Sequence, residues 1–128
     1  RAWEDLFSCP LFTAECFPSE ILREKHQKIP ENKYTKWFDY DKIKGTVSVR
    51  TRRPGDYFVL KDGKKKTVKA FMIDEKIPRT QRDRILLVTE GKHVLWIVGR
   101  RISEFYKVTD ATRQILQVSM DGGKEHGG

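Results

Sequence analysis

Three arginines stand directly before a tripeptide that is typical of a turn. Arg50, Arg52 and Arg53 precede Pro54-Gly55-Asp56. Proline lacks the backbone N–H that a strand ladder needs and glycine supplies backbone freedom, so this tripeptide is expected to end a strand in a sharp turn. The planar fork of arginine donates two parallel hydrogen bonds to a phosphate group. The pattern therefore predicts three guanidinium groups held at a fixed turn, where they could bind phosphates.

Basic residues are concentrated in the central third of the chain. Residues 42–84 contain fourteen lysines and arginines against five aspartates and glutamates, and charges elsewhere nearly cancel, so the net charge of +8 belongs to this segment. A localised positive field attracts a polyanion, of which nucleic acid is the commonest. For any single lysine, a solvated surface position is the simpler interpretation. The cluster as a whole, including Lys64, Lys65 and Lys66 at a second turn, favours nucleic-acid contact along one rim with the arginines.

Aromatic side chains near the basic segment have two interpretations. They could stack on unpaired bases, and the candidates for this are Trp37, Tyr40, Tyr57 and Trp96. Aromatic residues in strands more often belong to the core, and the residues assigned to the core are Phe38, Phe58, Phe71 and Trp96.

Motifs for catalysis are mostly lacking. Asp39 and Asp41 could coordinate Mg²⁺, but structural hydrogen bonding is the favoured interpretation, and a metal-dependent hydrolase built on these two and Asp56 is a minor hypothesis. The three histidines lie in unrelated contexts with no serine or cysteine close in sequence. The Asp121-Gly122-Gly123-Lys124 run lacks the strand and helix that flank a phosphate loop. The chain is therefore expected to have no catalytic, metal or cofactor site of its own.

Two cysteines indicate a reducing compartment. Cys9 and Cys16 have no partners at zinc-ligand spacing. A reduced, cytoplasmic chain is the plain interpretation, and a disulfide between the two remains an alternative.

Periodicity predicts mostly strands with one amphipathic helix. The expected strands are 11–17, 46–50, 57–60, 85–89, 93–99 and 115–120. Residues 67–76 show helical spacing of Val68, Phe71 and Met72, with Thr67 as the N-cap. A short helix or loop is expected at 19–28. Together these elements predict an α+β fold, mostly β, in which the helix lies on a small sheet or sandwich.

The 128 residues have the length of one domain. Residues 1–36 are expected to be a poorly defined N-terminal extension or linker with a possible strand, 37–120 the folded domain, and 121–128 a disordered tail. The chain starts with Arg1 and contains nothing close to the run of about 18 apolar residues that a membrane helix needs. It is thus expected to be a piece of a longer protein without a membrane span.

Several separated motifs resemble one known family in the same order. They are KWFDYDKI (36–43), RTRRPGDYF (50–58), KKTVKAFMIDEKIPR (65–79), QRDRILL (81–87) and LWIVGRRISEFYKVT (95–109). Together they resemble the C-terminal domain of bacterial tRNA(Ile)-lysidine synthetase.

The resemblance implies both a fold and a function. The family's enzyme is an ATP-dependent ligase that attaches lysine to the wobble cytidine of the tRNA(Ile) with a CAU anticodon. Its ATP and Mg²⁺ belong to an N-terminal catalytic domain whose phosphate loop this chain lacks. The chain would then be the part that binds the acceptor stem, with a fold similar to a domain of the phenylalanyl-tRNA synthetase β subunit. The partners that the resemblance implies are that tRNA, the protein's own catalytic domain and, in a homodimer, a second copy.

The predicted tRNA contacts are the basic residues of these motifs, with one further lysine taken from its place in the lysine run. The motif positions are Arg50, Arg52, Arg53, Lys65, Lys66, Lys69, Arg79, Arg82 and Arg101, and the added residue is Lys64. The alternative is a structural module that supports the catalytic domain or a dimer without touching RNA.

Overall fold

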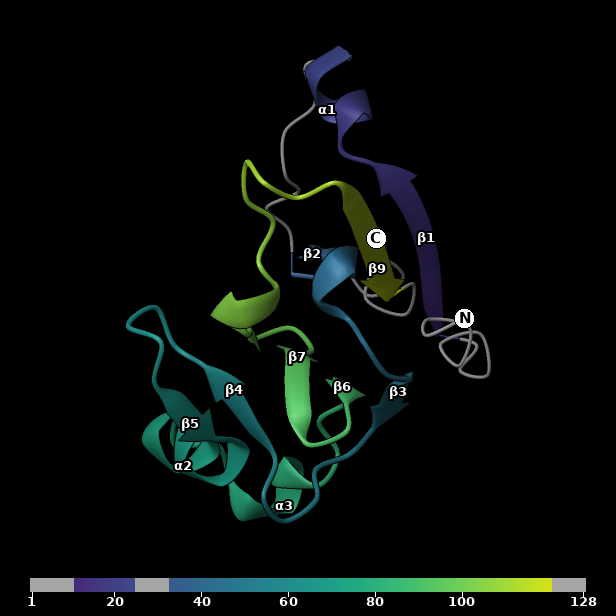
Figure 1. Cartoon of the computed structure of the whole chain (residues 1–128). Helices are drawn as coiled ribbons and strands as arrows, with labels where there is room; N and C mark the ends of the chain where they lie inside the picture. Colours follow the sequence, from purple (N-terminus) through teal and green to yellow (C-terminus); the bar gives the residue numbers. More distant parts are fainter. Residues whose placement is uncertain (1–10, 25–32, 121–128) are drawn as a thin grey trace.

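The described residues of the computed structural model form two β-sheets with short helices (Figure 1). The structure describes residues 11–24 and 33–120. The strands are β1 (Phe12–Pro18), β2 (Thr35–Asp39), β3 (Val47–Arg50), β4 (Tyr57–Val59), β5 (Lys65–Thr67), β6 (Leu87–Glu90), β7 (His93–Ile97), β8 (Arg101–Ile102) and β9 (Gln114–Met120). The helices are α1 (Glu20–Glu24), α2 (Val68–Asp74) and α3 (Arg79–Arg82), with 3₁₀ turns η2 (Tyr40–Lys42) and η3 (Glu104–Tyr106).

Sheet A joins strands from opposite ends of the described chain. Its strand order is β1-β9-β2, and both outer strands pair with β9 in antiparallel fashion. The β1 pairing runs from Phe12 opposite Met120 to Pro18 opposite Gln114. The strand expected near the N-terminus is therefore present, and it is part of the sheet. The division expected between residues 36 and 37 falls inside β2.

Sheet B carries the turn with the arginines. Its order is β3-β6-β7-β4-β5, and β8 pairs with β7. The predicted hairpin of β6 and β7 is confirmed as an antiparallel pair around Glu90-Gly91. Strands β4 and β7 run parallel and pair at Tyr57 and His93. This parallel pair places the start of β4, just after the Pro54-Gly55 turn, beside the start of β7.

Two cores lie on the two faces of sheet B. One core fills the space between the sheets and includes Phe38, Leu95 and Trp96, and the other packs under α2 and includes Phe58 and Phe71. The core assignments made for Phe38, Phe58, Phe71 and Trp96 are confirmed by exposed fractions of 0 to 5%.

A bulge in β7 explains how two adjacent residues reach the same core. Val88 pairs with Trp96 and Thr89 pairs with Val94, so Leu95 has no opposite residue on β6. An extra residue in one strand breaks the in-and-out alternation locally. Leu95 and Trp96 consequently both enter the core between the sheets, while Val94 serves the core under α2.

Helix α2 follows β5 without a break and caps sheet B. The side chain of Thr67 accepts a hydrogen bond from the backbone N–H of Ala70 at 3.1 Å, which confirms the predicted N-cap. Val68, Phe71 and Met72 are buried, as their spacing predicted. The helix ends at Asp74, two residues earlier than expected, because Lys76 has a positive φ of 55° and cannot continue it.

The predicted α+β, mostly β class is confirmed. The likeness to a phenylalanyl-tRNA synthetase domain stays a prediction. Cys9 and the tail 121–128 lie outside the described residues. Within the described part of the chain, no helix is long and apolar enough to cross a membrane.

Candidate nucleic-acid interface

A buried carboxylate holds the turn together. Asp56 is 2% exposed and accepts hydrogen bonds from Nη1 and Nη2 of Arg50 at 2.8 and 2.9 Å and from the backbone N–H of Arg53 at 2.8 Å. Gly55 has a φ of +89°, a conformation that side chains disfavour. The backbone freedom that the sequence predicted for Gly55 in this turn is confirmed. The turn is thus fixed by its own hydrogen bonds.

The charge state of Asp56 follows from these contacts. Burial by itself would raise its pKa, but the hydrogen bonds from Arg50 and from the Arg53 backbone, with the charges of both arginines, outweigh burial and lower the pKa below its ordinary value. Asp56 is therefore ionised at neutral pH and keeps its ion pair with Arg50.

Arg50 is engaged within the fold. Besides Asp56, its guanidinium donates to the carbonyl oxygens of Thr51 at 3.0 Å and Gly91 at 2.9 Å. Its side chain is only 14% exposed. Its guanidinium thus donates four hydrogen bonds, which connect the end of β3 to the turn and to the β6–β7 loop. These donors already have partners within the fold, and the phosphate contact of Arg50 stays a prediction.

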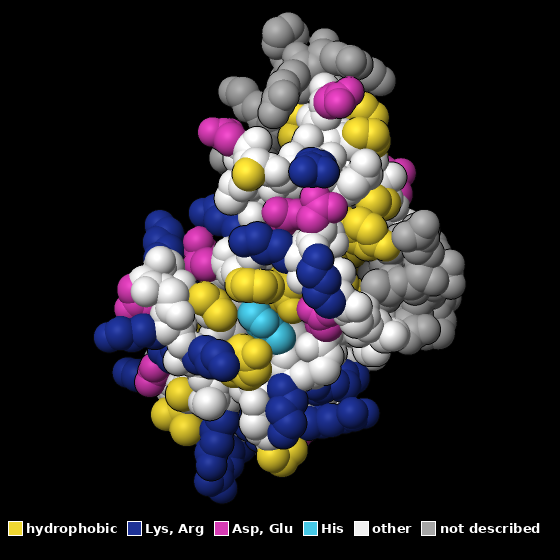
Figure 2. Space-filling view, viewed as in Figure 1, with side chains coloured by type: hydrophobic (Ala, Val, Ile, Leu, Met, Phe, Trp, Pro, Cys, Tyr) yellow, Lys and Arg dark blue, Asp and Glu magenta, His cyan; other side chains and the backbone are white. Residues whose placement is uncertain are grey.

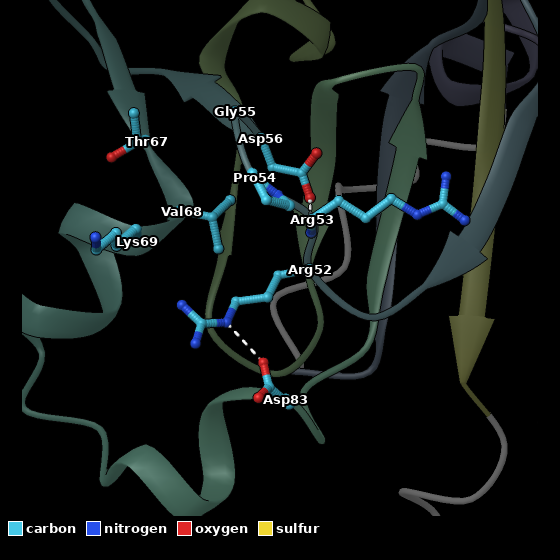
Figure 3. A pocket seen from close by; sticks show the side chains of 9 residues that line it. All are labelled: Arg52, Arg53, Pro54, Gly55, Asp56, Thr67, Val68, Lys69 and Asp83. Atoms are coloured by element: carbon cyan, nitrogen blue, oxygen red, sulfur yellow. Dashed lines mark hydrogen bonds and ion pairs between the residues drawn. The ribbon is translucent and has the colours of Figure 1, made fainter.

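A groove opens on one side of the turn. Its volume is about 480 Å³, and its lining residues are Arg52, Arg53, Pro54, Gly55, Asp56, Thr67, Val68, Lys69 and Asp83. Figure 3 shows Lys69 at the start of α2 facing Arg52 across this groove. Nε of Arg52 lies 2.9 Å from Oδ1 of Asp83, which keeps the arginine along the groove wall. The side chain of Asp83 is 77% exposed, so this ion pair is weak and can open to another anion.

A second hollow lies on the other side of the same turn. It measures about 450 Å³ and is lined partly by Arg53, Pro54 and Lys92. In Figure 3 the side chain of Arg53 extends away from Arg52, toward this second side. Nζ of Lys92 lies 3.4 Å from the carbonyl oxygen of Pro54. The turn is therefore a ridge between two hollows, and each hollow has basic side chains on its walls.

Lys92 was missed in the sequence analysis. Its signal was weak, because it is a lone lysine after the Glu90-Gly91 turn and lies outside the basic central segment. Pairing between β4 and β7 brings it to the ridge, since the backbone N–H of Tyr57 donates to the carbonyl of Lys92 at 3.0 Å.

The lysine run lies at the far end of the β4–β5 hairpin. Tyr57 pairs with Thr67 and Val59 with Lys65, so the run is displaced roughly 7–10 Å along the hairpin from the ridge. Lys64 is exposed at the tip, and Nζ of Lys66 lies 2.5 Å from Oδ2 of Asp74. From the sequence, the lysine run and the arginines were expected to lie along one rim. In the structure they lie at opposite ends of the β4–β5 hairpin.

The remaining predicted basic contacts are dispersed over sheet B and α3. Arg79 is exposed in α3, whereas Nε of Arg82 donates to the carbonyl of Ile77 at 2.8 Å. The guanidinium carbon of Arg101 lies 5.4 Å from the ring centroid of Phe58. Figure 2 shows lysine and arginine side chains gathered over the lower half of the molecule, where Figure 1 places sheet B, α2 and α3.

The stacking candidates separate into buried and surface residues. Trp37 is 6% and Trp96 0% exposed, so neither can stack on a base, and of the two interpretations the core one holds for both. Nε1 of Trp37 donates to Oε1 of Gln117 at 2.8 Å across sheet A. Tyr40 packs against the core between the sheets. Tyr57 is half-buried at the surface, with Nζ of Lys65 4.7 Å from its ring centroid.

The acidic residues considered for metal binding have structural roles. Asp39 accepts hydrogen bonds from the backbone N–H of Asp41 at 3.0 Å and from the hydroxyl of Thr112 at 3.0 Å, which confirms the structural interpretation for Asp39. Among the described residues there is no group of three or more histidine, cysteine or acidic side chains that could hold a metal ion.

The fold and the ridge between two hollows define a small, basic α+β domain that is mostly β. A family model described as the TilS substrate C-terminal domain matches residues 47–119, more than half of the chain. The chain belongs to this family.

Curated relatives and a solved structure agree with this assignment. The chain is 41% identical over 111 residues to the tRNA(Ile)-lysidine synthase of Clostridium tetani and 49% identical over 90 residues to that of Caldanaerobacter subterraneus. These matches cover 84% and 69% of the chain but only 23% and 19% of the relatives, so the chain spans about a fifth of their length. A crystal structure of a TilS C-terminal domain matches with a TM-score of 0.62 and 29% identity, over 85% of this chain and 82% of that one.

Proposed function

We propose that this chain is a tRNA-binding domain that holds the acceptor stem through the ridge at Arg53–Asp56 and its two hollows. The observation that carries the proposal is the preorganised ridge, a turn locked by Asp56 with Arg52, Arg53, Lys69 and Lys92 on the walls of its two hollows. Family membership supports it, since the relatives are named for an enzyme that acts on tRNA(Ile).

The ridge suits the backbone of an RNA duplex. An A-form helix shows proteins its shape, its phosphates and its 2′-hydroxyls, because side chains cannot reach the bases in its narrow major groove. A protruding, basic turn can meet phosphates on both of its sides, and arginine forks add directional hydrogen bonds. Such contacts position the RNA without reading its sequence.

The full-length protein would then be a ligase that attaches lysine to the wobble cytidine of the CAU-anticodon tRNA(Ile). In this proposal ATP and Mg²⁺ bind in a catalytic domain outside this chain, which itself contributes tRNA binding and no chemistry. The partners are that tRNA and the catalytic domain, and the protein works in the cytoplasm, where tRNA is modified.

A salt titration of tRNA binding tests the proposal. Phosphate contacts release condensed counterions, so each contact contributes roughly 0.7–0.9 to the slope of log K against log[salt]. Replacing Arg53 and Lys69 by alanine together should weaken binding and flatten the slope by about 1.4–1.8. The loss should be equal for cognate and non-cognate tRNAs.

The matched control is Arg113→Ala, which removes an exposed arginine next to β9, in the other sheet. It should leave affinity and slope unchanged, with circular dichroism confirming the fold of all variants. If the wild-type chain binds no tRNA, the proposal fails, and a structural module that supports the catalytic domain or a dimer takes its place. If the Arg53/Lys69 variant binds with the wild-type slope, the ridge is not the contact surface.

A further inference from the structure

Three rings lie in a row on the surface next to the ridge. The ring centroids of Tyr57 and His93 are 4.7 Å apart and those of His93 and Phe105 are 5.2 Å apart, with interplanar angles of 32° and 40°. The parallel pairing of β4 with β7 sets Tyr57 beside His93, and η3 brings Phe105 to the other side. We call these three residues the aromatic row.

Buried groups fix the aromatic row from below. Nε2 of His93 lies 2.9 Å from Oγ of Ser103, which also accepts from the backbone N–H of Val59 at 2.9 Å. Ser103 is fully buried, and the buried ring of Tyr106 lies 4.6 Å from that of His93. Burial lowers the pKa of His93, with the charge of Lys65 acting in the same direction and that of Glu90 opposing it. His93 therefore presents a neutral ring at neutral pH.

An ammonium group stands at each end of the row. Nζ of Lys65 is 4.7 Å from the ring centroid of Tyr57, and Nζ of Lys42 is 5.0 Å from that of Phe105. Figure 2 shows hydrophobic side chains gathered around a histidine on this face, with lysine and arginine side chains around them. Each ammonium lies over the outer face of an end ring, so these two faces are the ones that a flat base could take, and the displaced lysine could then meet a phosphate.

The exposure of Phe105 is not required by the fold. Its side chain is 43% exposed, whereas the neighbouring Tyr106 is 1% exposed and supplies the core contact of η3. A base pair inside a helix has both faces covered by its neighbours, so a base that stacks on a protein ring is unpaired or lies at the end of the helix. The row therefore suits nucleotides at or beyond the end of a duplex, in contrast to the ridge.

We propose that the aromatic row is a stacking platform whose two end rings, Tyr57 and Phe105, take unpaired nucleotides on their outer faces at the single-stranded end of the RNA duplex held by the ridge, while Lys42 and Lys65 move aside to contact the phosphates. This inference rests on the proposed RNA binding. The ridge and the platform adjoin, because Tyr57 directly follows Asp56 and His93 directly follows Lys92. In this proposal, a strand leaving the duplex at the ridge meets Tyr57 first.

The test compares two RNA hairpins of the same stem, one blunt and one with four unpaired nucleotides at its 3′ end that include 2-aminopurine. Stacking should quench the 2-aminopurine fluorescence when the wild-type chain binds. Base–aromatic stacking corresponds to about a 5- to 150-fold change in affinity, and Phe105→Ala should lose an amount in this range for the overhang hairpin only. Phe105→Trp should keep both affinity and quenching.

The matched control is Ile73→Ala, since Ile73 is an exposed hydrophobic residue of α2 at 49% exposure. It should change neither affinity nor quenching. Equal wild-type affinity for the two hairpins without quenching would overturn the platform and leave RNA binding by the ridge intact. Equal weakening of both hairpins by Phe105→Ala would also overturn it. Binding of neither hairpin by the wild-type chain would instead refute the proposed function.

Discussion

Replacing Asp56 by asparagine should destabilise the domain far more than any change at the exposed ion pair nearby. The carboxylate is 2% exposed and pairs with both terminal nitrogens of Arg50, whose side chain is 14% exposed. Asparagine keeps the shape and one acceptor for the Arg53 backbone, but it leaves the guanidinium without its counter-charge. Removing one partner of a buried pair costs about 3–5 kcal/mol. Because Arg50 keeps two carbonyl acceptors and some contact with water, we expect the lower end, about 3 kcal/mol.

Urea denaturation followed by tryptophan fluorescence measures this loss. Asp83→Asn is the matched control, because it removes the same charge from the Arg52 pair, whose Asp83 side chain is 77% exposed. An exposed pair contributes about 0–1 kcal/mol, so this variant should unfold almost like the wild type. A double-mutant cycle with Arg50→Ala then isolates the coupling between Arg50 and Asp56.

The dependence on pH provides a second readout for Asp56. Its pKa is lower in the folded state than its ordinary value of 3.8, so its stabilisation is fully present above that value and declines as pH falls through the folded pKa. The wild type should therefore lose more stability than Asp56→Asn when the pH is lowered from 6 to 3. Equal losses for Asp56→Asn and Asp83→Asn at neutral pH would refute the idea that this ion pair fixes the turn.

Three further predictions concern the turn, the histidine and catalysis. Gly55→Val should lower the free energy of unfolding by about 1–3 kcal/mol because of the positive φ of Gly55. Gly63→Val is the control for backbone strain alone, because Gly63 has a φ of +85° and a Cβ atom added there would meet no atom within 4 Å. Thermal melts of Gly55→Val that coincide with those of the wild type would contradict the strain at Gly55. The pKa of His93 is lower in the folded chain than in the unfolded chain, so the unfolded chain takes up the proton at a higher pH and the free energy of unfolding should fall as the pH drops below about 6.5. Urea denaturation at pH 7.5 and 5.5 should show a smaller loss of stability for His93→Gln than for the wild type. The purified chain with ATP, lysine and tRNA should form no lysidine, and detection of lysidine by mass spectrometry would show a catalytic site that the proposal does not contain.

Local sequence patterns predicted the elements of this fold well. The turn at Pro54-Gly55-Asp56, the N-cap at Thr67 and the β6–β7 hairpin depend on neighbouring residues, so their physics is visible in a short window of sequence. The family resemblance was also carried by local motifs, and the family model confirms it.

Long-range pairing could not be predicted in the same way. Sheet A depends on β1 meeting β9, about a hundred residues later, and no local pattern indicates that partner. The aromatic row was missed for the same reason, because His93 and Phe105 become neighbours of Tyr57 only through the parallel β4–β7 pair and η3.

The central place of β9 in sheet A has a consequence for synthesis of the chain on the ribosome. Strands β1 and β2 both pair with β9, so neither has its partner until residues 114–120 have emerged. Closing so long a loop is entropically unfavourable and slow compared with forming the hairpins of sheet B. Sheet B can therefore form first in the nascent chain, while the strand Phe12–Pro18 has no hydrogen-bonding partner yet. If a ribosome stalls before Gln114, both β1 and β2 stay unpaired in the nascent chain. Such a chain is prone to associate with other nascent chains through its exposed strand edges.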